Sequence, residues 1–273
     1  MDVIYEPKGA AGEYSPLAAN LYRGCTCGCR YCYAPATVRM SREAFARPAP
    51  RKDVLKALEK DAGKFAGTAL PVLLSFTSDP YQPLEFEPGP GGLTRRAIEI
   101  LDAASIPVKI LTKRPLAALD RDANVFLAAG VDFGVSLVWT AESDRKHWEP
   151  GAESVADRIV ALRLAHGWRL KTWVSLEPVI DPAQAIGVVM ATAAFVDCFK
   201  VGKLNHDRRR ESQIDWREFL FQILRELTDC GAGYRIKDSL WTHADREIRD
   251  RWPKEKETDQ HSTEQQGTSK PER

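Results

Sequence analysis

The sequence lacks an excess of charge of either sign, and it lacks a long apolar run. Its 273 residues carry 39 Lys and Arg against 38 Asp and Glu, a net charge of +1. This balance excludes the basic surface that bulk nucleic-acid binding requires, although it leaves room for a local basic cleft. The longest nearly apolar stretch, Ala185–Val196, is too short to cross a bilayer, and the N-terminus has no apolar core typical of a signal peptide. We therefore expect a cytoplasmic protein without membrane contact.

Cysteine is scarce and unevenly placed. Four of the 6 cysteines crowd into one short stretch: Cys25, Cys27, Cys29 and Cys32. The other two, Cys198 and Cys230, are isolated and distant in the sequence. Thiols this close together in a chain without a secretory signal indicate metal binding rather than disulfide bonds.

Apolar, β-rich runs alternate with segments of helical periodicity through most of the chain. Six runs predict strands: Leu17–Tyr22, Val72–Phe76, Val108–Thr112, Phe133–Val138, Thr172–Leu176 and Phe199–Leu204. Six segments predict helices: Lys52–Phe65, Leu93–Ala103, Pro115–Ala129, Ser154–His166, Pro182–Ala194 and Trp216–Cys230. The alternation predicts an α/β fold with a parallel sheet, either doubly wound or a full or partial barrel. Both architectures place the active site at the C-terminal ends of the strands.

We expect one domain over residues 1–253 and a disordered polar tail over residues 254–273. Hydrophobic residues make up 44% of the chain, which is enough for one sizeable core. The tail contains no hydrophobic residue. It therefore cannot bury enough apolar surface to order itself.

The clustered cysteines follow the first predicted strand, so they lie on a loop at its C-terminal end. Cubane iron–sulfur clusters are held by Cys thiolates, usually four of them. The spacing of Cys25, Cys29 and Cys32 lets three thiolates wrap three corners, with Gly24 and Gly28 easing the turn. One iron is then left without an obvious protein ligand. An open metal position of this kind is chemically useful, as it is in zinc hydrolases.

Two other interpretations of these cysteines stay open. A zinc knot formed by all four would suit a nucleic-acid-binding module, but zinc motifs normally use separated pairs and Cys27 lies too close to its neighbours. A non-enzymatic iron–sulfur electron carrier would need a fourth cysteine ligand. We interpret Cys27 as a bystander, and Cys25, Cys29 and Cys32 as the metal ligands.

The spacing of these three cysteines resembles that of the radical S-adenosylmethionine superfamily. The resemblance implies a partial (βα)6 barrel and a [4Fe–4S] cluster whose open iron binds S-adenosylmethionine. It also implies an enzyme in which one-electron reduction cleaves the cofactor and releases a 5′-deoxyadenosyl radical, which abstracts hydrogen from a substrate. A small electron donor such as flavodoxin or ferredoxin would supply the electron.

Residues 15–240 are more closely similar to the spore photoproduct lyase-like branch of that superfamily. The match carries three cofactor contacts onto this chain. Ser78, in the run Thr-Ser-Asp after the second strand, would contact the methionine moiety. Lys113 would pair with the cofactor carboxylate, as a point charge can, and Ser136 would contact the ribose.

Four further residues are candidates for the same site. The resemblance implies that Tyr31 and Tyr33, which flank Cys32, relay a radical during hydrogen return. Glu177 ends the fifth strand and Lys203 lies near the end of the sixth. These two either line the cavity, with Glu177 taking part in cofactor binding, or form a structural ion pair.

The sequence departs from the lyases at Phe76, where our alignment gives them a cysteine that donates hydrogen to the product radical. Phenylalanine cannot donate it, which argues against repair of the spore thymine dimer. Cys198 and Cys230 are candidate substitutes, although both positions are also typical of structural thiols. Asp207–Arg210 places three arginines after the sixth strand, where they would hold phosphates. A nucleic-acid substrate is therefore our hypothesis.

Overall fold

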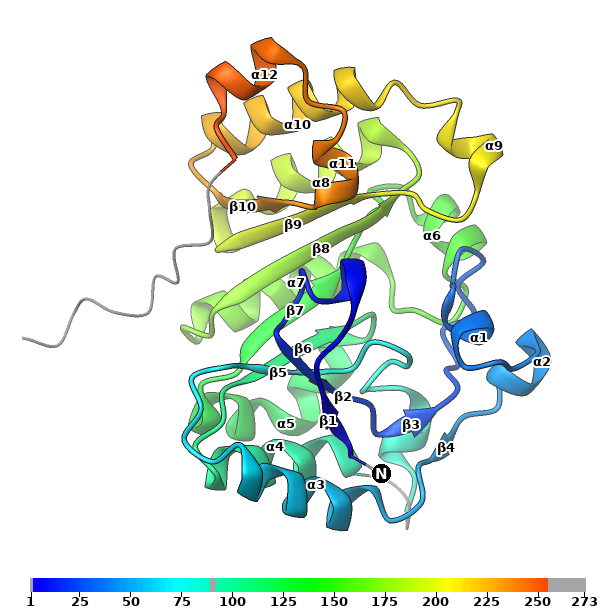
Figure 1. The fold of residues 1–273 in the computed structure, drawn as a ribbon, viewed down its shortest axis with the longest axis vertical. Helices are drawn as coiled ribbons and strands as arrows, with labels where there is room; N and C mark the ends of the chain where they lie inside the picture. Colours follow the sequence, from blue (N-terminus) through cyan, green and yellow to red (C-terminus); the bar gives the residue numbers. More distant parts are fainter. Residues whose placement is uncertain (1, 89–91, 255–273) are drawn as a thin grey trace, which may run out of the picture.

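The computed structural model describes residues 2–88 and 92–254. Apart from Lys254, the predicted polar tail lies outside the described residues. Figure 1 shows a curved central sheet with helices packed along its outer side. No described helix combines the length and the apolar character needed to span a membrane.

Eight strands form one sheet in the order β1-β2-β5-β6-β7-β8-β9-β10. Their bounds are β1 (Ile4–Tyr5), β2 (Leu17–Ala19), β5 (Val72–Leu74), β6 (Val108–Thr112), β7 (Asp132–Ser136), β8 (Thr172–Val179), β9 (Cys198–Lys203) and β10 (Gly233–Ile236). Every neighbouring pair is parallel except β1 and β2, which are antiparallel. A separate two-stranded sheet pairs β3 (Tyr22–Arg23) with β4 (Ala49–Pro50). The large sheet is a partial βα barrel, as predicted.

The helices between the parallel strands cover the outer side of the barrel (Figure 1). The longer ones are α3 (Val54–Lys64), α4 (Leu93–Ala103), α5 (Pro115–Ala129), α7 (Val155–Gly167), α8 (Pro182–Thr192) and α10 (Trp216–Asp229). The shorter helices of the described chain lie elsewhere in the connections or after the last strand: α1 (Ala34–Thr37), α2 (Arg42–Phe45), α6 (Glu142–Trp148), α9 (Arg208–Glu211), α11 (Asp238–Trp241) and α12 (Arg246–Arg251). Three 3-10 turns complete the set: η1 (Gly9–Ala11), η2 (Pro83–Phe86) and η3 (Ala193–Phe195).

Several helix boundaries follow from local chemistry. Helix α5 begins with Pro115 in its first turn and is followed by Gly130 in the left-handed region, with φ of 59°. The side chain of Ser154 caps α7 by accepting from the Asp157 N–H. Asp181 caps α8 in the same way, accepting from two N–H groups.

All six predicted strands and all six predicted helices are present, within a few residues at their ends. The first strand is shorter than predicted, because Asn20 leaves the sheet and Tyr22 pairs in the second one. Strand β10 was not predicted, since its sequence Gly-Tyr-Arg-Ile is partly exposed and has no long apolar run. Helix α6 was also missed.

The two faces of the barrel sheet differ in what they bury. Along each strand, side chains alternate between the faces. One set packs under the helices in the main core, for example Val72 and Leu74 on β5. The alternate set faces the concave side and forms a smaller cluster of Tyr14, Ala18, Leu73 and Trp173. This smaller cluster fills the base of the concave side and leaves the strand ends above it open to other side chains.

Lys200 on β9 is buried in this concave cluster. Its Nζ donates to the Tyr14 carbonyl oxygen at 2.7 Å and lies 5.4 Å from the Tyr14 ring centre and 5.2 Å from that of Trp173. Burial, together with the charge of Lys109, lowers the pKa of Lys200 to about 7. The amine is therefore largely neutral in the folded protein above that pH, whereas in the unfolded chain it stays protonated up to about pH 10.

This difference predicts a pH-dependent stability. Between about pH 7 and 10 the unfolded chain binds one more proton at Lys200 than the folded chain does, so the free energy of unfolding rises with pH. Lys200→Met removes that contribution, and its slope should be lower than that of the native sequence by roughly 1 kcal/mol per pH unit. Urea unfolding at several pH values measures both slopes. Lys171→Met, at a half-exposed lysine of the same region, is the control; equal slopes for Lys200→Met and the native chain would contradict the assignment.

Candidate active site

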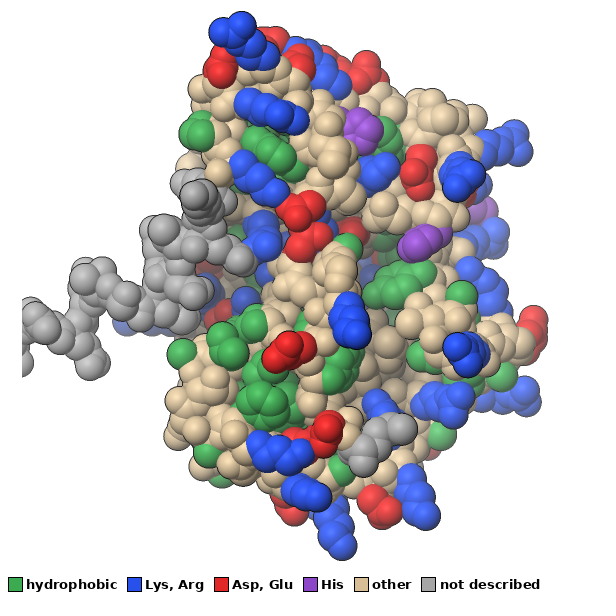
Figure 2. Space-filling view, viewed as in Figure 1, with side chains coloured by type: hydrophobic (Ala, Val, Ile, Leu, Met, Phe, Trp, Pro, Cys, Tyr) green, Lys and Arg blue, Asp and Glu red, His purple; other side chains and the backbone are tan. Residues whose placement is uncertain are grey.

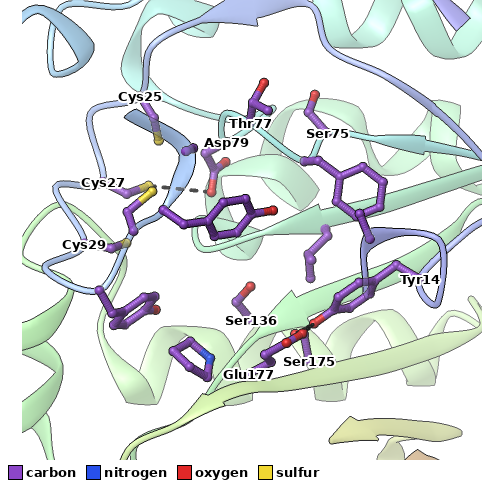
Figure 3. Close-up of a pocket in the computed structure, with 18 of the residues that line it drawn as sticks. Tyr14, Cys25, Cys27, Cys29, Ser75, Thr77, Asp79, Ser136, Ser175 and Glu177 are labelled. Atoms are coloured by element: carbon purple, nitrogen blue, oxygen red, sulfur yellow. Dashed lines mark hydrogen bonds between the residues drawn. The ribbon is translucent and has the colours of Figure 1, made fainter. Parts of the chain in front are cut away.

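A cavity of about 370 Å³ opens at the C-terminal ends of the parallel strands. Its lining includes residues from the cysteine loop and from the ends of six strands: Cys25, Cys27, Cys29, Cys32, Ser75, Ser78, Asp79, Lys113, Ser136, Glu177, Lys203 and Lys237. Figure 3 shows the cysteines on one side of the cavity and Tyr14, Ser175 and Glu177 on the other. The cavity is where the βα architecture predicts an active site.

The cysteine loop joins β3 to α1. Gly24 has φ of 92°, and a side chain there would lie 2.6 Å from the Phe45 carbonyl oxygen, so only glycine fits this turn. Gly28 is also left-handed, with φ of 62°. All four thiols of the loop line the cavity, among them those of the three predicted cluster ligands, Cys25, Cys29 and Cys32.

The donor set of the loop fits an iron–sulfur cluster. Thiolates are the ligands that such clusters prefer, and burial raises the pKa of the Cys29 thiol, so a bound cation is what would favour its thiolate form. Among the described residues, no three Cys, His, Asp or Glu side chains are arranged as ready ligands of a metal ion. Cluster binding therefore requires the cysteine side chains to rotate toward a common centre.

Asp79, from the Thr-Ser-Asp run, holds three separate segments together. Its carboxylate accepts from the Thr112 hydroxyl and from the Lys113 N–H, both at 2.7 Å, at the end of β6. It also accepts from the Tyr81 N–H at 2.9 Å and, at 3.7 Å, from the Cys27 thiol, drawn as a dashed line in Figure 3. Cys27 thus fastens the cysteine loop to the ends of β5 and β6.

Two hydroxyls beside Asp79 are buried without a partner. Ser78 is 8% exposed and Ser75 is 4% exposed, and neither Oγ has a hydrogen-bond partner among the described residues. Buried polar groups are nearly always hydrogen-bonded, so such orphans point to a missing ligand. Both hydroxyls line the cavity. Sequence reasoning found Ser78 and missed Ser75, which no motif marks.

Lys113 lies beside a buried carboxylate that sequence reasoning missed. Glu149 is fully buried after α6. It forms ion pairs with Arg158 at 2.7 Å and with Lys113 at 3.5 Å, and it accepts from the Tyr31 hydroxyl. Burial raises the pKa of Glu149, but Arg158 and Lys113 outweigh it and hold that pKa below its usual value. The two cations and one carboxylate leave a net positive charge beside the cavity, which suits an anionic ligand group.

The same network reaches Ser136. Arg158 on α7 donates to the Ser136 carbonyl oxygen at 2.8 Å. Ser136 is the last residue of β7, and it lines the cavity. Ser78, Lys113 and Ser136 therefore lie on three consecutive strand ends around one space, as the sequence resemblance implied.

Glu177 lines the far side of the cavity, and one of its carboxylate oxygens, Oε2, has two partners. Its carboxylate pairs with Lys237 at 2.7 Å and accepts from the Tyr14 hydroxyl at 2.5 Å. Its partner is not Lys203, which instead pairs with Glu211 at 3.3 Å. Lys237 was missed because it directly follows β10, the unpredicted strand.

Tyr33 and Phe76 also line the cavity, whereas the two isolated cysteines do not. Tyr33 is 46% exposed and faces the His206 ring. Cys198 begins β9, at the opposite end of the strand from the cavity. Cys230 caps the C-terminal end of α10 and is exposed. The structure thus keeps both thiols away from the site.

The fold is that of the radical S-adenosylmethionine enzymes, as the sequence resemblance predicted. One match is spore photoproduct lyase with bound S-adenosylmethionine and dinucleoside spore photoproduct, with a TM-score of 0.61, 16% identity, and coverage of 84% of this chain and 78% of the lyase. Another is Streptococcus suis SuiB bound to S-adenosylmethionine, with a TM-score of 0.58, 11% identity, and coverage of 87% of this chain and 55% of SuiB. No family model and no curated protein matches the sequence.

The Glu149 network predicts a large stability effect. Glu149→Gln leaves Lys113 and Arg158 as neighbouring buried cations without their carboxylate, which should cost roughly 3–5 kcal/mol. Glu153→Gln is a matched control from the same loop, because Glu153 only accepts from the Leu116 and Ala117 N–H groups of α5. That change should cost about 1 kcal/mol. Urea unfolding compares the two, and equal losses would show that Glu149 is an ordinary loop carboxylate.

Proposed function

We propose that this chain is a radical S-adenosylmethionine enzyme. One observation carries the proposal: the four thiols of the cysteine loop, a positively charged lysine network and two orphaned hydroxyls converge on one cavity at the strand ends. A [4Fe–4S] cluster with bound S-adenosylmethionine supplies, on one-electron reduction, the oxidising radical that abstracts hydrogen from a substrate.

Different residues bind the cluster and the different parts of the cofactor. Cys25, Cys29 and Cys32 hold the cluster and leave one iron for the cofactor. Lys113 binds the cofactor carboxylate, because the network around it carries the opposite charge. Ser78 offers its orphaned hydroxyl to the amino-acid end of the cofactor, and Ser136 contacts the ribose.

The remaining candidates line the rest of the cavity. Tyr31 is held by Glu149, and Tyr33 stands at the mouth with its hydroxyl free of hydrogen bonds within the described residues; both keep their proposed place in hydrogen return. Glu177, locked by Lys237, closes the far side rather than contacting the cofactor directly. Cys198 and Cys230 lie outside the cavity, so a substrate whose product needs no thiol donor fits better.

A nucleic-acid or nucleotide substrate is part of the proposal. Phe76 and Tyr14 line the cavity and pack edge to face against each other, and an aromatic lining of this kind suits a planar base. The lyase of similar fold binds dinucleoside spore photoproduct. The electron-carrier alternative needs a fourth thiolate, yet Cys27 is hydrogen-bonded to Asp79.

The first test separates ligands from bystander. Anaerobically reconstituted protein should hold about four irons per chain and form 5′-deoxyadenosine with S-adenosylmethionine and dithionite. Alanine at Cys25, Cys29 or Cys32 should abolish the product, since each change removes the only protein ligand of one iron. Cys27→Ala should keep most of it. Loss of iron from Cys27→Ala, or colourless protein with one zinc, would refute the three-ligand assignment.

The second test concerns Phe76. Supplied with dinucleoside spore photoproduct, the native chain should form 5′-deoxyadenosine but return little thymine, because Phe76 offers no thiol and the remaining non-ligand thiol of the cavity, Cys27, is hydrogen-bonded to Asp79. Phe76→Cys places a thiol there and should raise the thymine yield several-fold, whereas Phe76→Ser opens the same space without a donor. Chromatography of the products measures both. Clean thymine recovery by the native chain would overturn the inference about its substrate.

A further inference from the structure

The charge of the chain is concentrated around the cysteine loop. Residues 20–53 contain seven Lys and Arg against two Asp and Glu, a net charge of +5. The whole chain has a net charge of only +1, so the remainder is acidic. A segregation of this size creates a local field that the overall balance conceals.

Residues 20–53 fold as one unit around the cysteines. Strands β3 and β4 pair at its base, and the Cys25 N–H donates to the Phe45 carbonyl oxygen at 2.8 Å. Arg42 donates to the carbonyl oxygens of Cys29, Arg30 and Cys32. Arg42 therefore lies against the backbone of the cysteine loop, and the other arginines belong to the same folded unit.

The positive charge of this unit is not neutralised within the described residues. Arg23, Arg30, Arg39 and Arg47 are exposed, and none of them forms an ion pair there. By contrast, Arg217 on α10 pairs with both Asp245 and Glu247. Figure 2 shows Lys and Arg side chains gathered on the side where Figure 1 has α1, α2 and α9.

A second groove connects the surface of this basic unit with the candidate active site. A groove of about 480 Å³ is lined by Arg30, Arg42 and, from α9, Arg210. It also includes Cys32, which lines the main cavity as well. The outer basic surface and the cavity thus meet at one proposed cluster ligand.

The proposed function requires an electron from outside the chain. Reductive cleavage consumes one electron, and the described residues contain a single group of clustered cysteines, so no second cluster can relay it. Cofactor and substrate would fill the cavity itself. An electron carrier must therefore approach from the outer side of the cysteine loop.

We propose that the outer basic face, formed by Arg23, Arg30, Arg39, Arg42 and Arg47 with Arg208–Arg210 beside them, docks an acidic protein that carries a one-electron flavin or iron–sulfur centre. The proposal rests on the proposed function. One electron passes from the reduced centre of the carrier, which is oxidised, to the cluster, which is reduced, and no atom is transferred. Charge complementarity speeds this encounter by steering the carrier toward the cysteine loop.

A nucleic-acid strand is the competing occupant of this face. Binding of a single strand needs aromatic platforms on which bases stack, as well as cations. Tyr33 is the one strongly exposed large aromatic residue of the unit, and it belongs to the cavity mouth. Other rings, such as Trp148 and Tyr31, line the groove that leads to the site. The exposed part of the unit that bears Arg23, Arg39 and Arg47 is therefore rich in arginine and poor in stacking surface, which favours an acidic protein there.

The test compares two reductants on matched charge-reversal variants. Arg39→Glu/Arg47→Glu changes the basic face and leaves the cysteines and their neighbours untouched. Arg96→Glu/Lys60→Glu makes the same charge change at exposed positions on α4 and α3. Each protein is reconstituted and assayed for 5′-deoxyadenosine with photoreduced flavodoxin or with dithionite, over a range of salt concentrations. Flavodoxin binding to the cluster-free proteins is measured by surface plasmon resonance.

We expect the face variant to lose about tenfold or more in flavodoxin-driven rate and in flavodoxin affinity, with a weaker salt dependence. Its dithionite-driven rate, and both rates of the control variant, should match the native chain. Unchanged flavodoxin rate and affinity would overturn the docking proposal. So would loss of binding to a labelled oligothymidylate with an unchanged flavodoxin rate, which would assign the face to nucleic acid. Absence of product with dithionite in the native chain would instead refute the proposed function.

Discussion

The cysteine loop has no regular secondary structure, and its position depends on two buried carboxylates. Asp79 binds the Cys27 thiol on one side and the end of β6 on the other. Glu149 binds Tyr31 within the loop and Lys113 beyond it. Each carboxylate satisfies several donors at once, which offsets the cost of burying its charge. Together with the contacts of Arg42 to the loop carbonyl oxygens, these anchors bring the thiols and the lysine to one cavity.

The same anchors explain why some side chains around the cavity have hydrogen-bond partners and others have none. Side chains that hold the loop make strong contacts: the Tyr31 hydroxyl donates to Glu149, and Arg158 binds both Glu149 and the Ser136 carbonyl oxygen. The hydroxyls of Ser75 and Ser78 have none. A site built this way keeps its scaffold rigid and leaves the unpartnered groups for a ligand, which is how a preorganised binding site works. The outer basic face adds a separate route to the same loop.

Much of the fold followed from the sequence, because buried parallel strands and amphipathic helices leave clear periodic patterns. Short motifs likewise marked six residues that all line one cavity: Cys25, Cys29, Cys32, Ser78, Lys113 and Ser136. Glu149, Asn20 and Lys237 were not found. Their roles arise from contacts between segments distant in sequence: Asn20, for instance, accepts from the Phe76 and Thr77 N–H groups. Glu177 and Lys203 both line the cavity, which was one of the two sequence interpretations. The ion pair of Glu177 with Lys237 was not foreseen, because Lys237 follows a strand too short and polar to recognise.

The central claim is that three thiolates hold a cluster with one iron open to the cofactor. Mössbauer spectroscopy of protein reconstituted with ⁵⁷Fe tests it most directly. Adding S-adenosylmethionine should shift the signal of about one iron in four toward higher coordination and leave the other three unchanged. Four irons that all stay unchanged would mean a fully ligated cluster, and would contradict the claim.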